Sequence, residues 1–482
     1  MSNLSELLPT GGGQNAVDFV ASGTLSSGQA VVLKADGTVE AVVGSAESVG
    51  SNQTWADTAT QYPCCVYNSN TDRVIIAYKN PNNSSYGTAV VGSISGSTIT
   101  FGTPVVFASD TINYTAIETE PSSNHVVISY QFSGPPYYAS YGYAIVGAVS
   151  GTSISFGSAA FFEPYVTQWV AMGYDSTNNK YIIAYRGNGS SNGYGSAVVG
   201  TRSGTSISFG TVVYFQSSQC RFFAVSHDVA SGKNLICFED ETNSSDGKAV
   251  VGTVSGTSIS FGSTVTFETE ASYRRTLKYS SASSKHLLVY VAVIGGVAST
   301  IGTIATVSGT SVSFSTKTTV VSVAAGYVWL TYISNNDNFV LLHNNGTTVN
   351  VKTIAISTGN VVSGSATLIA NENALDNVIT YNSSDNSTII SYAVSGSNAA
   401  RAVVYAPAST NAPDFIGITA EAISDTATGA VNVYGGINEA QTGLTIGSDY
   451  YVQSDGSLST TASSVKAGQA ISATTINMMD LT

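Results

Sequence analysis

The chain has 482 residues, of which 43% are hydrophobic and only 10% are charged, and its formal net charge is −13. The hydrophobic share excludes a disordered chain and supplies a large core. The negative charge and the lack of a basic patch argue against nucleic-acid binding, which depends on displacing counterions. The many glycines, tyrosines and phenylalanines (47, 27 and 17) favour strands and turns over helices. We therefore expect an all-β protein.

The N-terminal segment, residues 1–14 (MSNLSELLPTGGGQ), lacks the basic and apolar regions of a secretory signal. The chain contains no run of about 18 apolar residues, so we expect no membrane insertion. The segment itself is either a flexible tail or a peptide that docks into a partner. The cysteines are too few for a disulfide framework and show no metal-ligand spacing with the histidines. We predict reduced, mostly buried thiols at Cys64, Cys65, Cys220 and Cys237, and no metal or cofactor.

An internal repeat dominates residues 45–408. The motif VGTVSGTSISFG, which begins at Val251, recurs with small changes from Val91, Val146 and Val199 and more weakly from Ile301. A second signal is a short apolar run, and its copies end 50 to 55 residues apart at Tyr78, Tyr130, Tyr185, Phe238, Tyr290, Leu342 and Tyr392. Seven units of about 50 residues predict a seven-bladed β-propeller. A β-helix, the next alternative, would repeat at shorter intervals.

Each unit is predicted to hold four strands. In the fourth unit, Leu235–Phe238 is continuously apolar, as in a strand buried on both faces. Ser258–Phe261 instead alternates between polar and apolar residues, as in a half-exposed strand. Buried inner strands and alternating outer strands are typical of blades packed face to face. We expect the phenylalanine that closes each outer strand to pack between blades, at Phe101, Phe156, Phe209, Phe261 and Phe314.

The ring is expected to close with strands from both ends of the repeat region. The seventh unit shows only three strands before Pro407, and a strand near Ser45–Gly50 is predicted to supply the fourth. Val49-Gly50 lies one repeat step before Phe101-Gly102 and occupies the same slot of the pattern. Closure of this kind removes two free sheet edges, which otherwise invite aggregation.

Residues 15–44 and 409–482 are predicted to form one small β-domain built from both termini. Leu25–Val39 aligns without a gap with Leu444–Leu458, and each reads as a glycine turn, a strand, an Asp-Gly hairpin turn and a second strand. The order of strands in a blade places both connections to this domain on the face that carries the short turns. The longer loops between second and third strands are then expected on the opposite face.

Catalytic signatures are missing from the sequence, and we predict no catalytic residues and no enzyme. The four histidines are expected to be structural, and Arg274-Arg275 is expected to lie in a solvated turn. Acidic pairs could serve glycoside hydrolysis, but charged residues at strand ends are usually only solvated. The acidic pairs of this kind are Glu118 with Glu120, Glu239 and Asp240 with Glu241, and Glu268 with Glu270.

The predicted loops between second and third strands are rich in Tyr, Asn, Ser and Gly, a composition that recognition surfaces favour. Tyrosine rings offer flat faces on which the C–H face of a sugar stacks, and amides meet its hydroxyl groups. The candidate ligand-binding residues are therefore Tyr86, Tyr137, Tyr138, Tyr141 and Tyr194. The same composition also fits ordinary polar hairpin loops.

The motif VSGTSISFG followed by V-x-F resembles the repeats of virion proteins of tailed bacteriophages, in particular the tail fibres of marine phages and cyanophages. The stretch GLTIGSDYYVQSDGSLSTTASSVKAGQAISATTI, which begins at Gly443, is similar to a module near the ends of such proteins. The resemblance implies a non-enzymatic protein of the virion surface, made in the host cytoplasm, that binds a host glycan or receptor. It also implies a homo-oligomer that contacts other virion proteins through the terminal β-domain and the N-terminal peptide.

Two alternatives stay open. The glycines Gly28 and Gly447 and the Asp-Gly turns resemble small capsid-decoration domains, which would make the chain a purely structural decoration or head-fibre protein. The other alternative is a propeller enzyme that degrades polysaccharide. The resemblance lies in framework positions, so it assigns no binding residue.

Overall fold

The computed structural model describes residues 15–57, 60–133, 140–187, 193–322, 326–397 and 399–478. The chain divides into two compact units, a smaller one of Met1–Ser48 with Pro407–Thr482 and a larger one of Val49–Ala406. Strands make up 65% of the residues, which confirms the all-β prediction. Within the described ranges, the only helical element is a 3-10 turn at Ala412–Asp414, and no helix there is long and apolar enough to cross a membrane.

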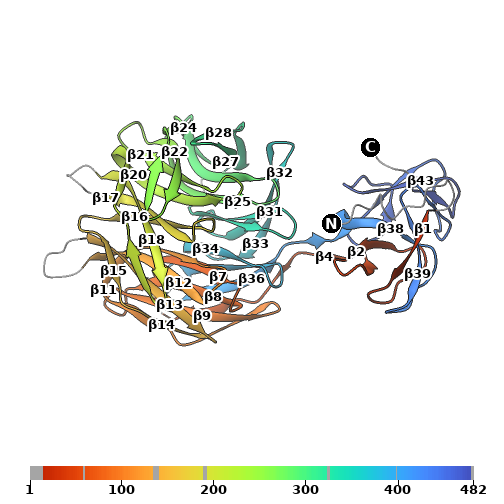
Figure 1. Ribbon diagram of the computed structural model, residues 1–482, viewed down its shortest axis with the longest axis horizontal. Helices are drawn as coiled ribbons and strands as arrows, with labels where there is room; N and C mark the ends of the chain where they lie inside the picture. The colour runs from red at the N-terminus through yellow and green to blue at the C-terminus, as the bar shows by residue number, and fades with distance from the viewer. Residues whose placement is uncertain are drawn as a thin grey trace. The chain divides into compact units, whose positions relative to one another are not determined.

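The larger unit is a series of antiparallel sheets that lie side by side (Figure 1). Two sheets are nine-stranded because β11 and β20 each pair first with one group of four strands and then with the next. The first comprises β7 (Gln61–Asn68), β8 (Arg73–Asn80), β9 (Tyr86–Ser95), β10 (Thr98–Phe101), β11 (Val105–Thr119), β12 (His125–Ser133), β13 (Ser140–Ser150), β14 (Ser153–Phe156) and β15 (Ala160–Glu163). The second comprises β16 (Gln168–Asp175), β17 (Lys180–Gly187), β18 (Tyr194–Ser203), β19 (Ser206–Phe209), β20 (Val213–Asp228), β21 (Lys233–Asp240), β22 (Asp246–Ser255), β23 (Ser258–Phe261) and β24 (Val265–Glu268).

Three further sheets complete this unit. A five-stranded sheet holds β25 (Ser272–Ser280), β26 (Lys285–Ile294), β27 (Val297–Ser308), β28 (Ser311–Phe314) and β29 (Thr318–Val321). A four-stranded sheet holds β30 (Val328–Ile333), β31 (Asn338–Asn344), β32 (Val349–Ser357) and β33 (Asn360–Ala370). In the last, β34 (Ala374–Asn382), β35 (Ser387–Val394) and β36 (Ala400–Ala406) are joined by β5 (Ser48–Val49) and β6 (Gln53–Ala56).

The first strands of successive groups lie next to one another. They follow the order β7, β11, β16, β20, β25, β30 and β34, and β34 in turn lies against β7. The second strands are the most deeply buried. In β21, for example, Leu235, Ile236, Cys237 and Phe238 are all fully buried, as the continuous apolar run predicts. The hydrophobic core of this unit therefore consists of clusters between neighbouring sheets.

The outer strands carry the repeated Phe-Gly pair. In β23 the side chain of Ile259 is buried, and that of Phe261 is half-buried against the preceding group of strands, where its ring lies 5.1 Å from that of Phe215. Corresponding ring pairs join Phe156 to Phe107, Phe209 to Phe162 and Phe314 to Phe267 at 5.6, 5.4 and 5.2 Å. These phenylalanines are thus packing residues between neighbouring groups of strands.

The glycine after each phenylalanine marks a close approach of two backbones. A Cβ at Gly102 would collide with the carbonyl oxygen of Thr152, in the turn of the next group. Gly157, Gly210 and Gly262 meet the corresponding residues of the groups that follow them. The SFG of one repeat and the SGT of the next are therefore two halves of one contact.

The smaller unit contains two five-stranded sheets. One is formed by β1 (Ala16–Val20), β39 (Thr428–Val433), β38 (Phe415–Thr419), β2 (Ala30–Leu33) and β3 (Val39–Ala41). The other is formed by β40 (Ile437–Asn438), β44 (Ile476–Asn477), β43 (Lys466–Ala470), β41 (Asp449–Val452) and β42 (Leu458–Ser459). A two-stranded ladder pairs β4 (Gly44–Ser45) with β37 (Ser409–Thr410).

The hairpins β2–β3 and β41–β42 are equivalent, as their sequence alignment predicts. Leu33 pairs with Val39 and Val452 pairs with Leu458. In each turn an aspartate, Asp36 or Asp455, accepts a hydrogen bond of 3.0 Å from the backbone N–H two residues later. The hydroxyl groups of Thr38 and Ser457 donate to the same carboxylates at 2.6 Å, and these bonds, together with the backbone ones, hold the pKa of both carboxyl groups below the ordinary value. The N-terminal segment 1–14 lies outside the described residues.

One prediction about the basic residues is wrong. Arg274 and Arg275 do not form a solvated turn but lie within β25, and Arg275 is buried. Its guanidinium donates hydrogen bonds to the carbonyl oxygens of Phe222 and Ser272, each at 3.0 Å. The buried carbonyls at the neighbouring bulge need donors, and Arg275 supplies them.

Two of the four histidines join neighbouring groups of strands. His227 lies 3.6 Å from Asp175 of the preceding group, and His286 lies 3.5 Å from Asp228. Burial lowers the pKa of His286, although its bond to Asp228 opposes that shift. Both contacts are structural, in agreement with the sequence interpretation.

Candidate binding site

Most of the first strands begin with the same irregularity. The pairing register of β7 shifts between Gln61 and Cys64, and equivalent β-bulges occur in β11, β16, β20, β25 and β34. At each bulge one non-glycine residue has a φ between +47° and +55°, at Tyr62, Tyr114, Trp169, Phe222, Arg274 and Asp376. Bulky side chains rarely adopt this left-handed conformation, and such outliers concentrate at functional sites.

These six residues and Tyr327, which immediately precedes β30, are called here the mouth residues. Four aromatic side chains form a continuous row, in which the ring centroids of Tyr62 and Tyr114 lie 5.1 Å apart. Tyr114 lies 5.1 Å from Trp169, and Trp169 lies 4.4 Å from Phe222. These separations are typical of favourable aromatic pairs.

The row continues through the two charged mouth residues. The guanidinium of Arg274 lies 4.5 Å from the centroid of the Tyr327 ring, a cation–π contact. The Tyr327 hydroxyl donates a hydrogen bond to the Asp376 carboxylate, which also accepts one from the backbone N–H of Tyr62. Residues from seven separate segments of the chain are thereby brought into one set.

The mouth residues line a cavity of about 380 Å³, the outer cavity. Burial raises the pKa of Tyr62, Tyr114 and Tyr327, and the negative charge of Asp376 adds to this shift at Tyr62 and Tyr327. Burial also raises the pKa of Asp376, against its hydrogen bonds from Tyr327 and Tyr62. The tyrosines therefore stay neutral and keep their hydroxyl groups as donors.

A buried amide also lines the outer cavity. Asn377 is 1% exposed, and neither atom of its side-chain amide forms a hydrogen bond with any residue that the structure describes. Buried polar groups in proteins almost always have a partner, so each exception calls for an explanation. Asn377 offers both a donor and an acceptor beside the aromatic row.

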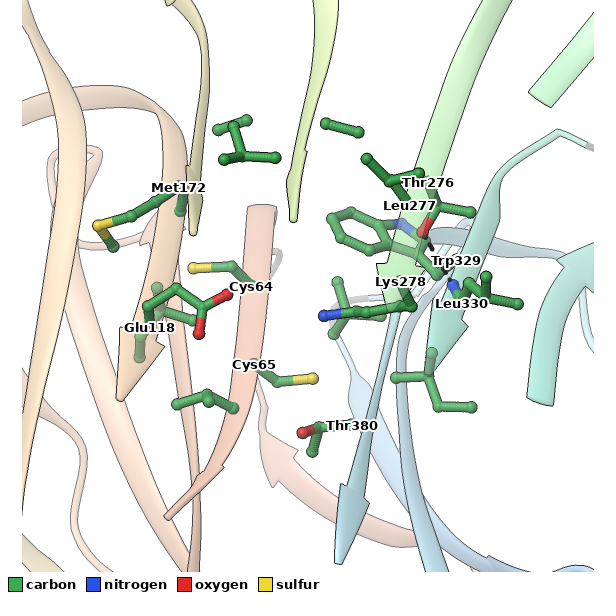
Figure 2. Close-up of a pocket in the computed structure, with 18 of the residues that line it drawn as sticks. Cys64, Cys65, Glu118, Met172, Thr276, Leu277, Lys278, Trp329, Leu330 and Thr380 are labelled. Carbon is green, nitrogen blue, oxygen red and sulfur yellow. Dashed lines mark hydrogen bonds between the residues drawn. The ribbon is translucent and has the colours of Figure 1, made fainter. Parts of the chain in front are cut away.

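An inner cavity of about 180 Å³ shares several lining residues with the outer one, among them Thr115, Phe223 and Trp329. All seven first strands contribute to its wall. Figure 2 shows the carboxylate of Glu118 and the ammonium of Lys278 directed toward one another from opposite walls, with Cys65 between them. Burial raises the pKa of Glu118, and Lys278 opposes this shift.

Of the other acidic residues considered for catalysis, all but Glu270 form ion pairs within the described residues. Glu120 binds Arg202. Glu239 binds Arg221 at 2.9 Å, and Glu268 binds Lys317 at the same distance. Their carboxylates serve contacts within the larger unit, so the candidate site consists of the aromatic mouth and the two cavities.

The tyrosines predicted from the loops lie elsewhere. Tyr86, Tyr141 and Tyr194 occupy equivalent positions at the start of β9, β13 and β18, in three consecutive groups. Tyr141 packs on Phe161 and Tyr194 packs on Tyr214, both with ring centroids 5.9 Å apart. None of the three belongs to the residues that line the two cavities. Tyr137 and Tyr138 lie outside the described residues, so the proposed loop site stays a prediction.

The sequence carried a signal for the mouth that the motif analysis did not use. The five aromatic mouth residues, Tyr62, Tyr114, Trp169, Phe222 and Tyr327, follow the repeat step. Their neighbours in sequence vary, however, so no conserved-looking motif surrounds them. Only the step itself marks them as equivalent.

No family model and no curated protein matches this chain. Similar solved structures include the Cps50 (Swd1) β-propeller domain of Myceliophteria thermophila, with 10% identity, a TM-score of 0.47 and coverage of 73% of this chain and 99% of that one. Sqt1 from Chaetomium thermophilum has 12% identity, a TM-score of 0.44 and coverage of 73% and 83%. Trypanosoma rangeli sialidase has 10% identity, a TM-score of 0.41 and coverage of 82% and 59%. Identities this low indicate a likeness of fold alone.

Proposed function

We propose that Val49–Ala406 is a seven-bladed β-propeller whose last blade is completed by β5. The ring order of the first strands supports this arrangement, since β34 lies against β7. The glycine contacts support it as well. Gly50 donates its N–H to Val404 at 2.8 Å, as Gly102 does to Val91 at 2.9 Å, and a Cβ at Gly50 would collide with Ser97 as one at Gly102 would with Thr152.

We further propose that the protein binds a carbohydrate at the mouth without cleaving it. The observation that carries this proposal is the aromatic row held in a strained conformation by successive bulges. Strain of about 1–3 kcal/mol at each position persists only where the fold maintains it. Flat rings flanked by hydroxyl, amide and guanidinium groups suit a sugar, whose C–H faces stack while its hydroxyl groups form hydrogen bonds.

For the biological setting we propose a bacteriophage virion surface protein, a tail fibre or similar appendage. This proposal rests on the resemblance of the repeat and of the C-terminal stretch. A capsid-decoration or head-fibre role is the structural alternative. Strand directions within the larger unit are compatible with attachment opposite to recognition. The mouth residues begin the first strands at the end where the loops between second and third strands lie, whereas β36 ends at Ala406 beside the short turns.

A polysaccharide-degrading enzyme remains the second candidate, and Glu118 is the observation that favours it. A carboxyl group whose pKa is raised by burial is what a general acid requires. Incubation with host envelope polysaccharide and an assay for new reducing ends separates the two functions. We expect no new reducing ends. If the wild type produces them and Glu118→Gln does not, the protein is an enzyme.

The binding proposal is tested with variants of the full chain on immobilised host polysaccharide. Trp169→Gly removes the ring at the centre of the aromatic row and should weaken binding about tenfold or more. Tyr165→Ala removes an aromatic ring that is 53% exposed and lies outside both cavities, so it serves as the matched control. Equal loss in both variants would contradict a site at the mouth.

The loop prediction has its own test. Replacing Tyr137 and Tyr138 with Ala should weaken adsorption to the host and leave the protein on the particle, while deletion of residues 1–14 should release it from the particle. If the tyrosine variant fails to assemble but adsorption persists, the loops are contacts between subunits and the decoration role is favoured.

A further inference from the structure

The cationic residues of this acidic protein are few, and three of them lie on one strand of the site. The chain has 17 Lys and Arg against 30 Asp and Glu. Arg274, Arg275 and Lys278 all belong to β25 and line the outer cavity, the inner cavity or both. One wall of the site is therefore basic, in a protein whose net charge is −13.

The three side chains differ in how many of their donors are already engaged by other residues. Arg275 donates to backbone carbonyl groups, so its role is structural. Arg274 stacks on Tyr327 and forms no ion pair within 4.0 Å with the described residues. Lys278 likewise forms no such pair in the described part of the chain, and Glu118 faces it across the inner cavity.

The one carboxylate among the mouth residues is already engaged. Asp376 accepts hydrogen bonds from the Tyr327 hydroxyl and from the Tyr62 backbone. The donors of Arg274 are not matched in this way, and its guanidinium is spread over an aromatic face, where it stays accessible from the cavity. The planar fork of an arginine fits a carboxylate through two parallel hydrogen bonds.

We propose that the ligand of the mouth is an acidic polysaccharide of the uronic-acid class, and that Arg274 binds its carboxylate while the sugar ring stacks on the aromatic row. This inference rests on the proposed carbohydrate binding and adds the charge of the ligand. Lys278 lies deeper on the same wall and attracts the same charge. The negative net charge of the protein repels a polyanion at long range, so the attraction of the basic wall acts only close to the site.

The test compares one polymer in two forms, a polyuronate and the same polyuronate after chemical reduction of its carboxyl groups. The full-length wild-type protein should bind the acid at least about tenfold more tightly than the reduced polymer, and added salt should narrow that gap. Arg274→Gln should lose about tenfold to a hundredfold on the acid and little on the reduced polymer. Arg274→Lys keeps the positive charge but loses the planar guanidinium group, so its affinity for the acid should lie between those of the wild type and Arg274→Gln.

Lys34→Gln is the matched control, because it removes one positive charge from the smaller unit and should leave both affinities unchanged. Circular dichroism and thermal unfolding establish that each variant is folded. If the reduced polymer binds as well as the acid, and Trp169→Gly weakens both while Arg274→Gln weakens neither, carbohydrate binding stands and the acidic ligand is overturned. If neither polymer binds, and neutral host glycans do not bind either, both proposals fail. A polysaccharide that carries sulfate groups and no carboxyl groups should bind more weakly than the polyuronate. Equally tight binding would overturn the assignment of a carboxylate.

Discussion

In the larger unit, aromatic residues recur with the same period on the outer strands and on the inner strands, but the two sets have different roles. On the outer strands, Phe156 and Phe209 pack against phenylalanines of the preceding groups of strands. On the inner strands, Tyr114 and Trp169 recur at almost the same step, yet they line a cavity. Residue type and spacing are alike in the two regions, so neither property decides whether a ring packs or faces a ligand.

The backbone makes the difference. An outer strand such as β23 pairs without a register shift, so its side chains alternate and the aromatic ring turns toward the neighbouring sheet. An inner strand such as β16 carries a bulge, which places Trp169 in the left-handed region and changes the phase of the alternation. One extra residue in the strand is therefore enough to turn an aromatic side chain from the neighbouring strands toward the cavity.

The largest effect should come from the packing side of this comparison. Phe162 is 6% exposed, whereas its neighbour Phe161 is 46% exposed. Phe162→Ala should lower the free energy of unfolding by about 3–5 kcal/mol, because it leaves a cavity between sheets. Phe161→Ala should cost less, because its half-exposed ring loses two ring contacts but leaves no enclosed cavity. Denaturant unfolding of both variants measures the difference, and similar losses would mean that the strand register is wrong.

A second pair of substitutions tests the closure of the ring. Gly102→Ala forces a Cβ against the Thr152 carbonyl and should cost about 1–3 kcal/mol through overpacking. Gly50→Ala should cost a similar amount if β5 completes the last blade. Ser97→Ala is the control, because it leaves the backbone of the Ser-Gly turn unchanged. Gly96 is unsuitable as a control, since its positive φ would strain any substitution although the space around it is open. A Gly50→Ala protein as stable as the wild type would contradict the proposed closure.

Substitution of a mouth residue should change ligand binding more than the free energy of unfolding. Trp169→Gly loses two ring contacts, worth about 0.5–1.5 kcal/mol each, and relieves about 1–3 kcal/mol of backbone strain. The two terms oppose each other and the lost burial of the half-buried ring remains, so the free energy of unfolding should fall by less than in Phe162→Ala. Trp169→Ala removes the same contacts and keeps the strained backbone, so it should be the less stable of the two. The reverse order, measured by thermal unfolding, would show that the bulge is not strained.

The smallest effect concerns pH. Because the pKa of Asp376 is raised on folding, the folded state holds this proton more firmly than the unfolded state. Its contribution to stability is therefore greatest in acid and is lost as the pH rises from the ordinary value of 3.8 through the raised value. Asp376→Asn should gain stability relative to the wild type as the pH rises above the ordinary value of 3.8. A constant difference between the two melting curves over this range would contradict the shift.

The sequence by itself determined the strand content, the repeat period of about 50 residues and the buried or half-exposed character of each strand. These properties are local, since they follow from the alternation of side chains along a strand and from turn residues at fixed steps. The equivalence of the hairpins at Leu25–Val39 and Leu444–Leu458 was readable for the same reason, and the two turns form matching hydrogen bonds.

Only the tertiary structure decided where the site lies. The mouth gathers residues from Tyr62 to Asp376, which are more than three hundred positions apart in the chain, and a bulge that no motif announces turns them toward the cavity. The same cause placed Arg274 in the site, where the isolated Arg274-Arg275 pair had suggested a solvated turn. A period identifies equivalent residues, but the face on which they lie depends on strand register, and register is set by the partner strands.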